Sequence, residues 1–144
     1  MKYATLGRIV NASLARCFAA VVAVGLGGCG AEDAQPPLSA AAEHGKQIFN
    51  QCRACHAVKR ATGHLVGPNL SSVYGSQAGR NDGYAYSTSM KESGIVWTDD
   101  ALDTYLTRPS EYVPGTKMTF GGLSRAEDRA GIIAYLKAAS RQNL

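Results

Sequence analysis

The segment Cys52-Arg53-Ala54-Cys55-His56 most narrowly limits what this 144-residue chain can fold into. C-x-x-C-H is the attachment pattern of a c-type haem, in which the two thiols form thioethers with the haem vinyl groups. The cysteines straddle the porphyrin edge, and the adjacent imidazole reaches the iron from one side. The pattern therefore predicts one covalent haem c, attached through Cys52 and Cys55, with His56 as an axial ligand of the iron.

A pair of cysteines at this spacing also occurs in redox disulfides and in zinc sites. A zinc site needs two further ligands, and the chain beyond Cys29 contains no other cysteine. The remaining histidines, His44 and His64, have no paired spacing. A thioredoxin-like dithiol needs a βαβ setting, which the hydrophobic pattern does not show. Haem attachment is therefore the interpretation that the sequence favours.

An electron-transfer haem with six-coordinate iron needs a second axial ligand. The chain has three methionines: Met1, Met90 and Met118. Met1 lies in the N-terminal segment and Met90 in a polar stretch, whereas Met118 follows Pro114 and Gly115, which favour a fixed loop. A thioether ligand stabilises the reduced iron and raises the potential. Although many methionines only fill a core, we expect Met118 to be the second ligand.

Residues 1–28 have the pattern of a secretory signal peptide. Three basic residues come first, and the apolar stretch from Cys17 to Gly28 is shorter than the ~20 residues that span a bilayer. The segment ends in Leu26-Gly27-Gly28-Cys29, which resembles the lipobox of bacterial lipoproteins. This predicts export to the bacterial periplasm or cell-surface side, with a lipid anchor at Cys29. Ordinary cleavage, for example after Ala31, is the alternative and would give a soluble periplasmic protein.

The rest of the chain divides into a linker, residues 29–39, and a single domain, residues 40–144. Pro36 and Pro37 keep the linker extended. The hydrophobic content of 45% and the charged content of 18% exclude a disordered polar chain. The formal net charge is +4, but the signal peptide holds three of the 15 Lys and Arg and no acidic residue. The mature domain is nearly neutral, and we expect no nucleic-acid partner.

The first helix of the domain should end at the haem motif. Its apolar residues recur at helical spacing: Leu38, Ala42, Gly45, Phe49 and Cys52. Gly45 should cost this helix about 1 kcal/mol, but on its apolar face it would allow another backbone to approach closely.

Two further helices are predicted from capping residues. One should follow Thr98, whose hydroxyl can cap it, and carry Leu102, Tyr105 and Leu106 toward the haem. The other should begin at Ser124 in a capping box with Glu127. Its apolar stripe consists of Ile132, Ile133 and Leu136, with Tyr135 at the edge. We find no convincing alternating strand, so the predicted fold class is all-α.

From about Glu43 to Ser140 the chain resembles class I cytochrome c, most closely the mitochondrial type and its short bacterial relatives. The resemblance rests on stretches in family order and at family distances: Gly45–Phe49, Cys52–His56, Gly67–Leu70, Gly83–Tyr86, Trp97–Asp100, Tyr105–Leu106, Pro114–Met118 and Ile133–Leu136. It implies an all-α cytochrome c fold in which the N- and C-terminal helices cross at Gly45 and the haem lies in a helical and loop shell.

The resemblance also implies roles for individual residues. The carbonyl of Pro68 should accept a hydrogen bond from His56, and His64 should tie loops together. Three aromatic residues should donate to the haem propionates: Tyr84, Tyr86 and Trp97. Three more residues should line the haem pocket, the first beside the methionine ligand and the others flanking the exposed haem edge: Tyr105, Thr116 and Phe120.

The implied function is one-electron transfer by a monomeric, non-enzymatic carrier. Its partners would be a quinol–cytochrome c oxidoreductase and a terminal oxidase, or else a photosynthetic reaction centre or a periplasmic dehydrogenase. A haem peroxidase or gas sensor is the alternative class, and it needs an open or labile position on the iron, against which Met118 speaks.

The chain departs from the mitochondrial pattern in its charges. Several docking lysines are replaced, by Gln51, Leu65, Ser110, Glu111 and Ser124. Ser76 replaces an arginine found near a propionate, and Met90 replaces an asparagine of the distal hydrogen-bond network.

Overall fold

The computed structural model describes residues 36–142, so the predicted signal peptide, Cys29 and most of the predicted linker lie outside the described residues. Five α-helices and two 3₁₀ turns follow in this order: α1 (Ala40–Ile48), η1 (Phe49–Gln51), η2 (Arg60–Thr62), α2 (Thr88–Glu92), α3 (Asp99–Thr107), α4 (Pro109–Tyr112) and α5 (Ala126–Gln142). Extended pairing within this part is limited to one isolated antiparallel bridge, between Gln77 and Val96. The all-α prediction is confirmed.

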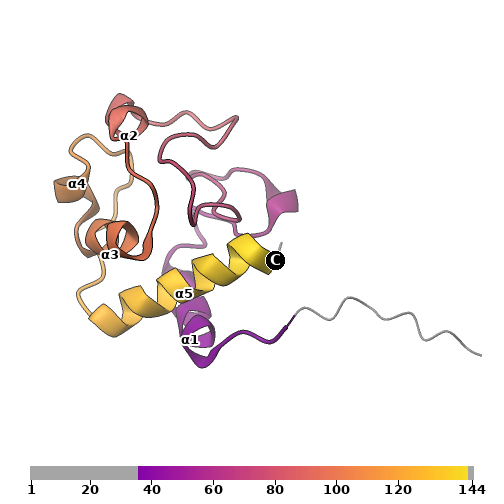
Figure 1. Cartoon of the computed structure of the whole chain (residues 1–144). Helices are drawn as coiled ribbons and strands as arrows, with labels where there is room; N and C mark the ends of the chain where they lie inside the picture. Colours follow the sequence, from indigo (N-terminus) through magenta and orange to yellow (C-terminus); the bar gives the residue numbers. More distant parts are fainter. Residues whose placement is uncertain (1–35, 143–144) are drawn as a thin grey trace, which may run out of the picture. The chain divides into compact units, whose positions relative to one another are not determined.

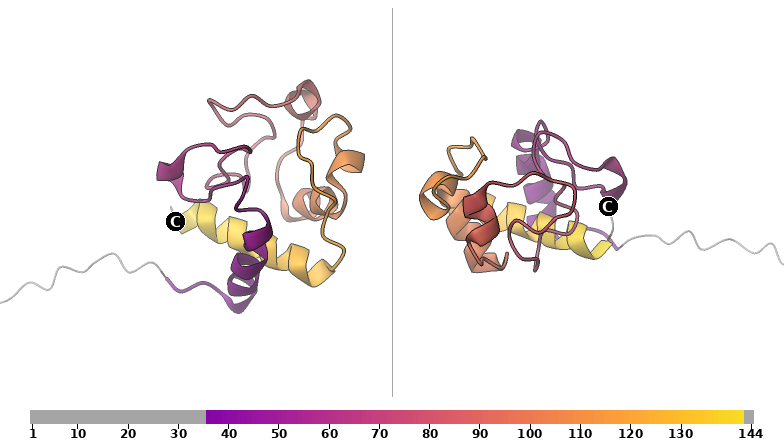
Figure 2. Two further views of the ribbon diagram at one scale, coloured as in Figure 1. Left: turned by 180° about the vertical axis from the view of Figure 1, so that it is seen from behind. Right: turned by 90° about the horizontal axis from the view of Figure 1, so that it is seen from above.

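The first and last helices form the base of the domain. Figure 1 and both views of Figure 2 show α5 lying across α1. At the crossing, a Cβ atom on Gly45 would lie 1.9 Å from the carbonyl oxygen of Gly131, and one on Gly131 would lie 2.9 Å from Cδ2 of His44. The close approach predicted at Gly45 is therefore confirmed, and it needs a second glycine, Gly131, that the sequence analysis did not single out.

The side chains of Thr98 and Ser39 cap the N-termini of two helices, and of these only the Thr98 cap was predicted. The Thr98 hydroxyl accepts a hydrogen bond from the Ala101 N–H at 3.3 Å, as predicted for α3. The Ser39 hydroxyl does the same for α1, accepting from the Ala42 N–H at 3.2 Å. The helical path from α1 reaches the haem motif as expected, but its last turn, η1, is a 3₁₀ turn.

The predicted start of the C-terminal helix is wrong by two residues. The helix α5 begins at Ala126, and the Arg129 N–H donates to the Arg125 carbonyl at 3.3 Å. The Arg129 guanidinium also donates to the carbonyls of Leu123 and Ser124, both at 3.0 Å, and to the Asp103 carboxylate at 2.8 Å. These contacts hold the chain ahead of Ala126 in a loop, so Ser124 lies outside the helix.

The core lies between α3, α5 and the loops that follow the haem motif. The residues predicted to face it from α3, namely Leu102, Tyr105 and Leu106, are all buried. Tyr135, predicted at the edge of the α5 stripe, is buried as well and packs against Phe49 with 5.4 Å between ring centroids. Within residues 36–142, no helix combines the length and the apolar character needed to cross a bilayer.

Candidate haem site

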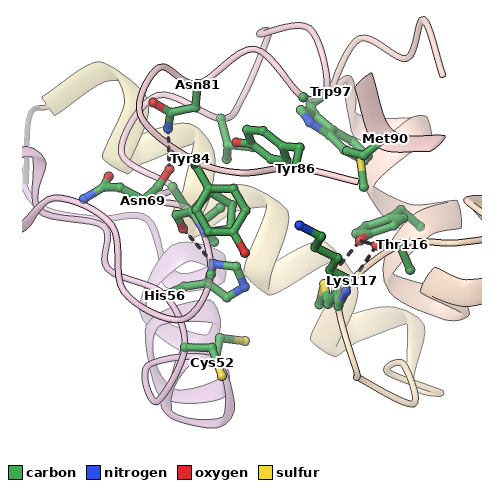
Figure 3. A pocket seen from close by; sticks show the side chains of 18 of the residues that line it. Cys52, His56, Asn69, Asn81, Tyr84, Tyr86, Met90, Trp97, Thr116 and Lys117 are labelled. Carbon is green, nitrogen blue, oxygen red and sulfur yellow. Dashed lines mark hydrogen bonds between the residues drawn. The ribbon is translucent and has the colours of Figure 1, made fainter. Parts of the chain in front are cut away.

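A cavity of about 470 Å³ opens between the haem-motif segment, the loops of residues 66–87, α3 and the loop after α4. All four residues predicted to bind the haem covalently or through its iron line it: Cys52, Cys55, His56 and Met118. Figure 3 shows Cys52 and His56 on one side of the cavity and Thr116 and Lys117 on another. Residues from both halves of the domain therefore meet around one space.

The turn of the C-x-x-C-H motif brings its three functional side chains to that space. The backbone N–H groups of Cys55 and His56 both donate to the Cys52 carbonyl, at 3.0 and 2.9 Å. The two cysteines are free thiols, with Cys52 half-buried and Cys55 exposed at the cavity mouth. Burial, followed by the neighbouring Cys55, raises the pKa of the Cys52 thiol. Both thiols are thus available for thioether formation along one edge of the cavity.

The His56 ring is oriented by its other nitrogen. Its Nδ1 lies 2.8 Å from the Pro68 carbonyl oxygen, the contact that the resemblance implies. Because a carbonyl only accepts, Nδ1 carries the proton and Nε2 keeps its lone pair for a metal. Burial lowers the pKa of the imidazole and the Pro68 contact partly offsets this, so the neutral, metal-binding form is favoured. A Cβ on Gly67 would lie 2.4 Å from Cε1 of the ring, so only glycine leaves room for it.

Met118 is held by a second set of contacts. The Tyr105 hydroxyl donates to the Met118 sulfur at 3.3 Å and lies 3.1 Å from the Thr116 hydroxyl. The Thr116 hydroxyl in turn accepts from the Met118 N–H at 3.3 Å. The turn before it contains Gly115 at φ +87°, in the left-handed region where glycine is favoured. The fixed loop predicted around Met118 is therefore present.

The aromatic residues predicted to meet the propionates gather on the upper wall in Figure 3. Tyr84 and Tyr86 pack edge to face at 4.7 Å, and Trp97 is buried. Burial raises the pKa of Tyr86 to about 12, so it stays a neutral donor. The Tyr84 hydroxyl, however, donates to the Val66 carbonyl at 2.9 Å. Its predicted bond to a propionate would have to replace or share that contact.

The predicted structural role of His64 is confirmed by its two hydrogen bonds. Its Nδ1 accepts from the Asn69 N–H at 3.0 Å, and its Nε2 donates to the Asp82 carbonyl at 2.7 Å. The sequence analysis missed the part played by Asn69, which is 6% exposed and donates to the carbonyls of Lys59 and Gly63 at 2.8 and 2.9 Å. The sequence did contain a signal for this role, because Asn69 is a polar residue within the Gly67–Leu70 stretch.

The remaining predicted pocket residues, Thr116 and Phe120, are half-buried and line the cavity. Met90 does so too, at 7% exposure, from the short helix α2. It therefore contributes apolar surface to the pocket.

The donor set suits a haem. A free thiol pair beside an oriented imidazole and a thioether on the same cavity is a combination found in c-type cytochromes, where sulfur and nitrogen ligands hold a low-spin iron. Apolar residues of α3 and α5 close the inner side of the cavity, whereas polar ones line the side of residues 72–87. An apolar macrocycle with two carboxylates requires walls of these two kinds.

Comparisons with known proteins agree with this geometry. The cytochrome c family model matches residues 42–140. Cytochrome c of Guizotia abyssinica is 44% identical over 100 residues, covering 69% of this chain and 90% of the relative. Cytochrome c of Theileria parva is 48% identical over 97 residues, covering 67% and 84%. The solved structure of cytochrome cH from Methylobacterium extorquens matches with a TM-score of 0.63 and 43% identity, over 67% of this chain and 96% of that one.

The family match spans most of the domain, and relatives of this identity are covered over most of their own length. The chain belongs to the cytochrome c family, electron-transfer proteins that are not enzymes and that carry one covalent haem c.

Proposed function

We propose that this electron carrier holds its haem iron between His56 and Met118. The observation that carries the proposal is that both side chains line one cavity together with Cys52 and Cys55. The haem would supply a reversible one-electron couple. If His56 and Met118 both bind the iron, no site would remain on it for a substrate or gas, which separates a carrier from a peroxidase or sensor.

The two ligands are supported in ways that suit electron transfer. The Pro68 carbonyl would increase the donor strength of His56 and fix its ring plane. The Tyr105 hydroxyl would fix the Met118 sulfur from the other side. Ligands that are already in place before a change of oxidation state keep structural rearrangement small during transfer.

We further propose that residues 1–28 export the chain and that Cys29 anchors it to a membrane. The linker of residues 29–39 would reach at most ~35–40 Å, so an anchored domain would stay near membrane complexes. A quinol–cytochrome c oxidoreductase as donor and a terminal oxidase as acceptor fit this position. Intact mass of the exported protein reports haem, cleavage site and acyl chains together. An unacylated protein that begins after Ala31 would contradict the anchor.

Some positions that carry docking lysines in mitochondrial cytochromes c are not basic in this chain, among them Gln51 and Leu65. Leu65 and its neighbour Val66 are 44% and 77% exposed. Lys117, which is basic, donates to the Ala85 carbonyl at 2.7 Å. A smaller number of free cations at the docking positions would weaken electrostatic steering, which a tether would offset by concentrating the protein near its partners. Tethered and Cys29→Ser forms should therefore differ in turnover with a membrane oxidase but not in potential; equal turnover would refute this role of the anchor.

The ferric spectrum tests the axial ligands. The wild type should be low-spin, with the charge-transfer band of methionine-ligated ferric haem, and should not bind carbon monoxide without denaturant once reduced. Met118→Ala should lose the band and bind carbon monoxide, whereas the matched variant Met90→Ala should keep the band. If Met90→Ala loses the band and Met118→Ala keeps it, or if the wild type is high-spin, the proposal is wrong.

A further inference from the structure

The polar side of the cavity is formed by one segment of the chain. Residues 76–87 contribute Ser76, Gln77, Arg80, Asn81 and Asp82 together with the tyrosines already described. The opposite wall is apolar, with Leu102 and Leu106 from α3 and Ile132 and Leu136 from α5. Because charged carboxylates are costly to bury against apolar groups, the propionates of a bound haem would be held on the side of residues 76–87.

Two basic side chains line the cavity, Arg80 and Lys117. Lys117 is engaged with the Ala85 carbonyl at 2.7 Å. Arg80, by contrast, makes no hydrogen bond or ion pair with any other residue between positions 36 and 142. Asp82, two residues away, adds a carboxylate to the same wall and makes an uncompensated propionate there still less favourable.

The polar neighbours of Arg80 are already occupied. The Ser76 hydroxyl donates to the Val73 carbonyl at 2.7 Å, and the Asn81 amide donates to the Asn69 carbonyl at 2.8 Å. The guanidinium is therefore the strongest unengaged donor on the wall, and it has the planar, two-pronged geometry that fits a carboxylate.

The backbone on both sides of Arg80 is fixed. Gly79 has φ +71°, and a Cβ on it would lie 2.7 Å from the Cα of Lys91, so the chain is pressed against α2 just before Arg80. Just after it, Asn81 is held by its bond to the Asn69 carbonyl. The backbone of Arg80 is thus held in place at the cavity wall, although its side chain is exposed.

We propose that Arg80 binds and neutralises a propionate carboxylate of the haem. The proposal rests on the covalent haem of the family and on the polar wall, and it does not depend on which residues ligate the iron. A cation beside the propionate favours its ionised form. It also disfavours the more positive ferric state, so it raises the reduction potential.

The test compares Arg80→Gln with Arg80→Lys in the haem-loaded protein. The control is Arg60→Gln, which removes an exposed arginine of η2 that does not line the cavity. The readout is the midpoint potential measured by spectroelectrochemistry as a function of pH. We expect Arg80→Gln to lower the potential and to move the pH range over which it changes to higher pH, because the propionate loses its cation. Arg80→Lys keeps the charge and should therefore stay close to the wild type in both potential and pH range. Arg60→Gln should change neither the potential nor the pH range appreciably.

The proposal is overturned if Arg80→Gln matches Arg60→Gln in potential and pH profile. It is also overturned if Arg80→Lys shifts both as much as Arg80→Gln, since the effect would then not follow the charge. The ferric charge-transfer band is recorded on the same samples. A variant that keeps the band keeps its methionine ligand, so a change in its potential reports on the propionate and not on the axial ligands. If Arg80→Gln does not mature, Arg80→Met, which keeps a long side chain and removes the charge, takes its place, and a potential and pH profile equal to those of Arg60→Gln would again overturn the proposal.

Discussion

The side of the cavity that carries His56 and the side that carries Met118 are built differently. The His56 side is a dense network in which Pro68, Asn69 and His64 fix one another through side-chain and backbone hydrogen bonds. The Met118 side depends on a short loop and on one tyrosine hydroxyl that contacts the sulfur. The two cysteines proposed to attach the haem also lie on the His56 side. The comparison indicates that His56 is rigidly held, so that of the two proposed ligands Met118 is the one that perturbation should release first.

The largest loss of stability is expected from Gly67→Ala, because the backbone of Gly67 lies against the His56 ring. In Gly67→Ala the new methyl group would lie 2.4 Å from the imidazole, whose position is fixed by Pro68. Overpacking of this kind should reduce the free energy of unfolding of the haem protein by about 3 kcal/mol, measured by guanidinium denaturation. Gly121→Ala, where a Cβ meets no atom within 4 Å, is the matched control. A Gly67→Ala protein as stable as that control would show that the His56 side is not tightly packed.

A smaller loss is expected from Asn69→Ala. Its buried amide satisfies the carbonyls of Lys59 and Gly63 and its oxygen accepts from the Ser71 N–H at 2.8 Å. Leaving such groups without partners should cost about 2 kcal/mol of unfolding free energy, while the methionine charge-transfer band stays. The control, Asn50→Ala, removes an exposed amide that accepts from Arg53 at 3.3 Å. If Asn69→Ala abolished the band with little loss of stability, the two sides would not be independent.

The two sides also differ in how far the sequence predicted them. The motif itself indicated Cys52, Cys55 and His56, because the attachment chemistry depends on local spacing alone. The helix caps at Thr98 and the close approach at Gly45 were likewise readable from neighbouring residues. The start of α5 was not predictable in this way, since Arg129 binds the nearby Leu123 and Ser124 carbonyls while its guanidinium is also held by the distant Asp103 carboxylate. The hydrogen bond from the Tyr84 hydroxyl to the Val66 carbonyl also joins two separate loops, and local sequence could not predict it.

The smallest effect, and the most direct test of the Met118 side, is expected from Tyr105→Phe. This change removes the hydroxyl that donates to the Met118 sulfur and contacts Thr116, but keeps the ring that packs on Trp97 at 5.0 Å. One lost hydrogen bond should weaken the hold on Met118 by about 1 kcal/mol. Added imidazole should then displace the methionine at a roughly fivefold lower concentration, because 1.4 kcal/mol corresponds to a factor of ten. The expected loss of overall stability is small, since the ring stays in place. Tyr112→Phe is the control: the residue is 37% exposed, its ring packs on Tyr105 at 6.4 Å between centroids, and loss of its hydroxyl should leave imidazole binding unchanged. An unchanged imidazole affinity in Tyr105→Phe would mean that the loop alone holds Met118, and that the two sides differ less in rigidity than their hydrogen bonds indicate.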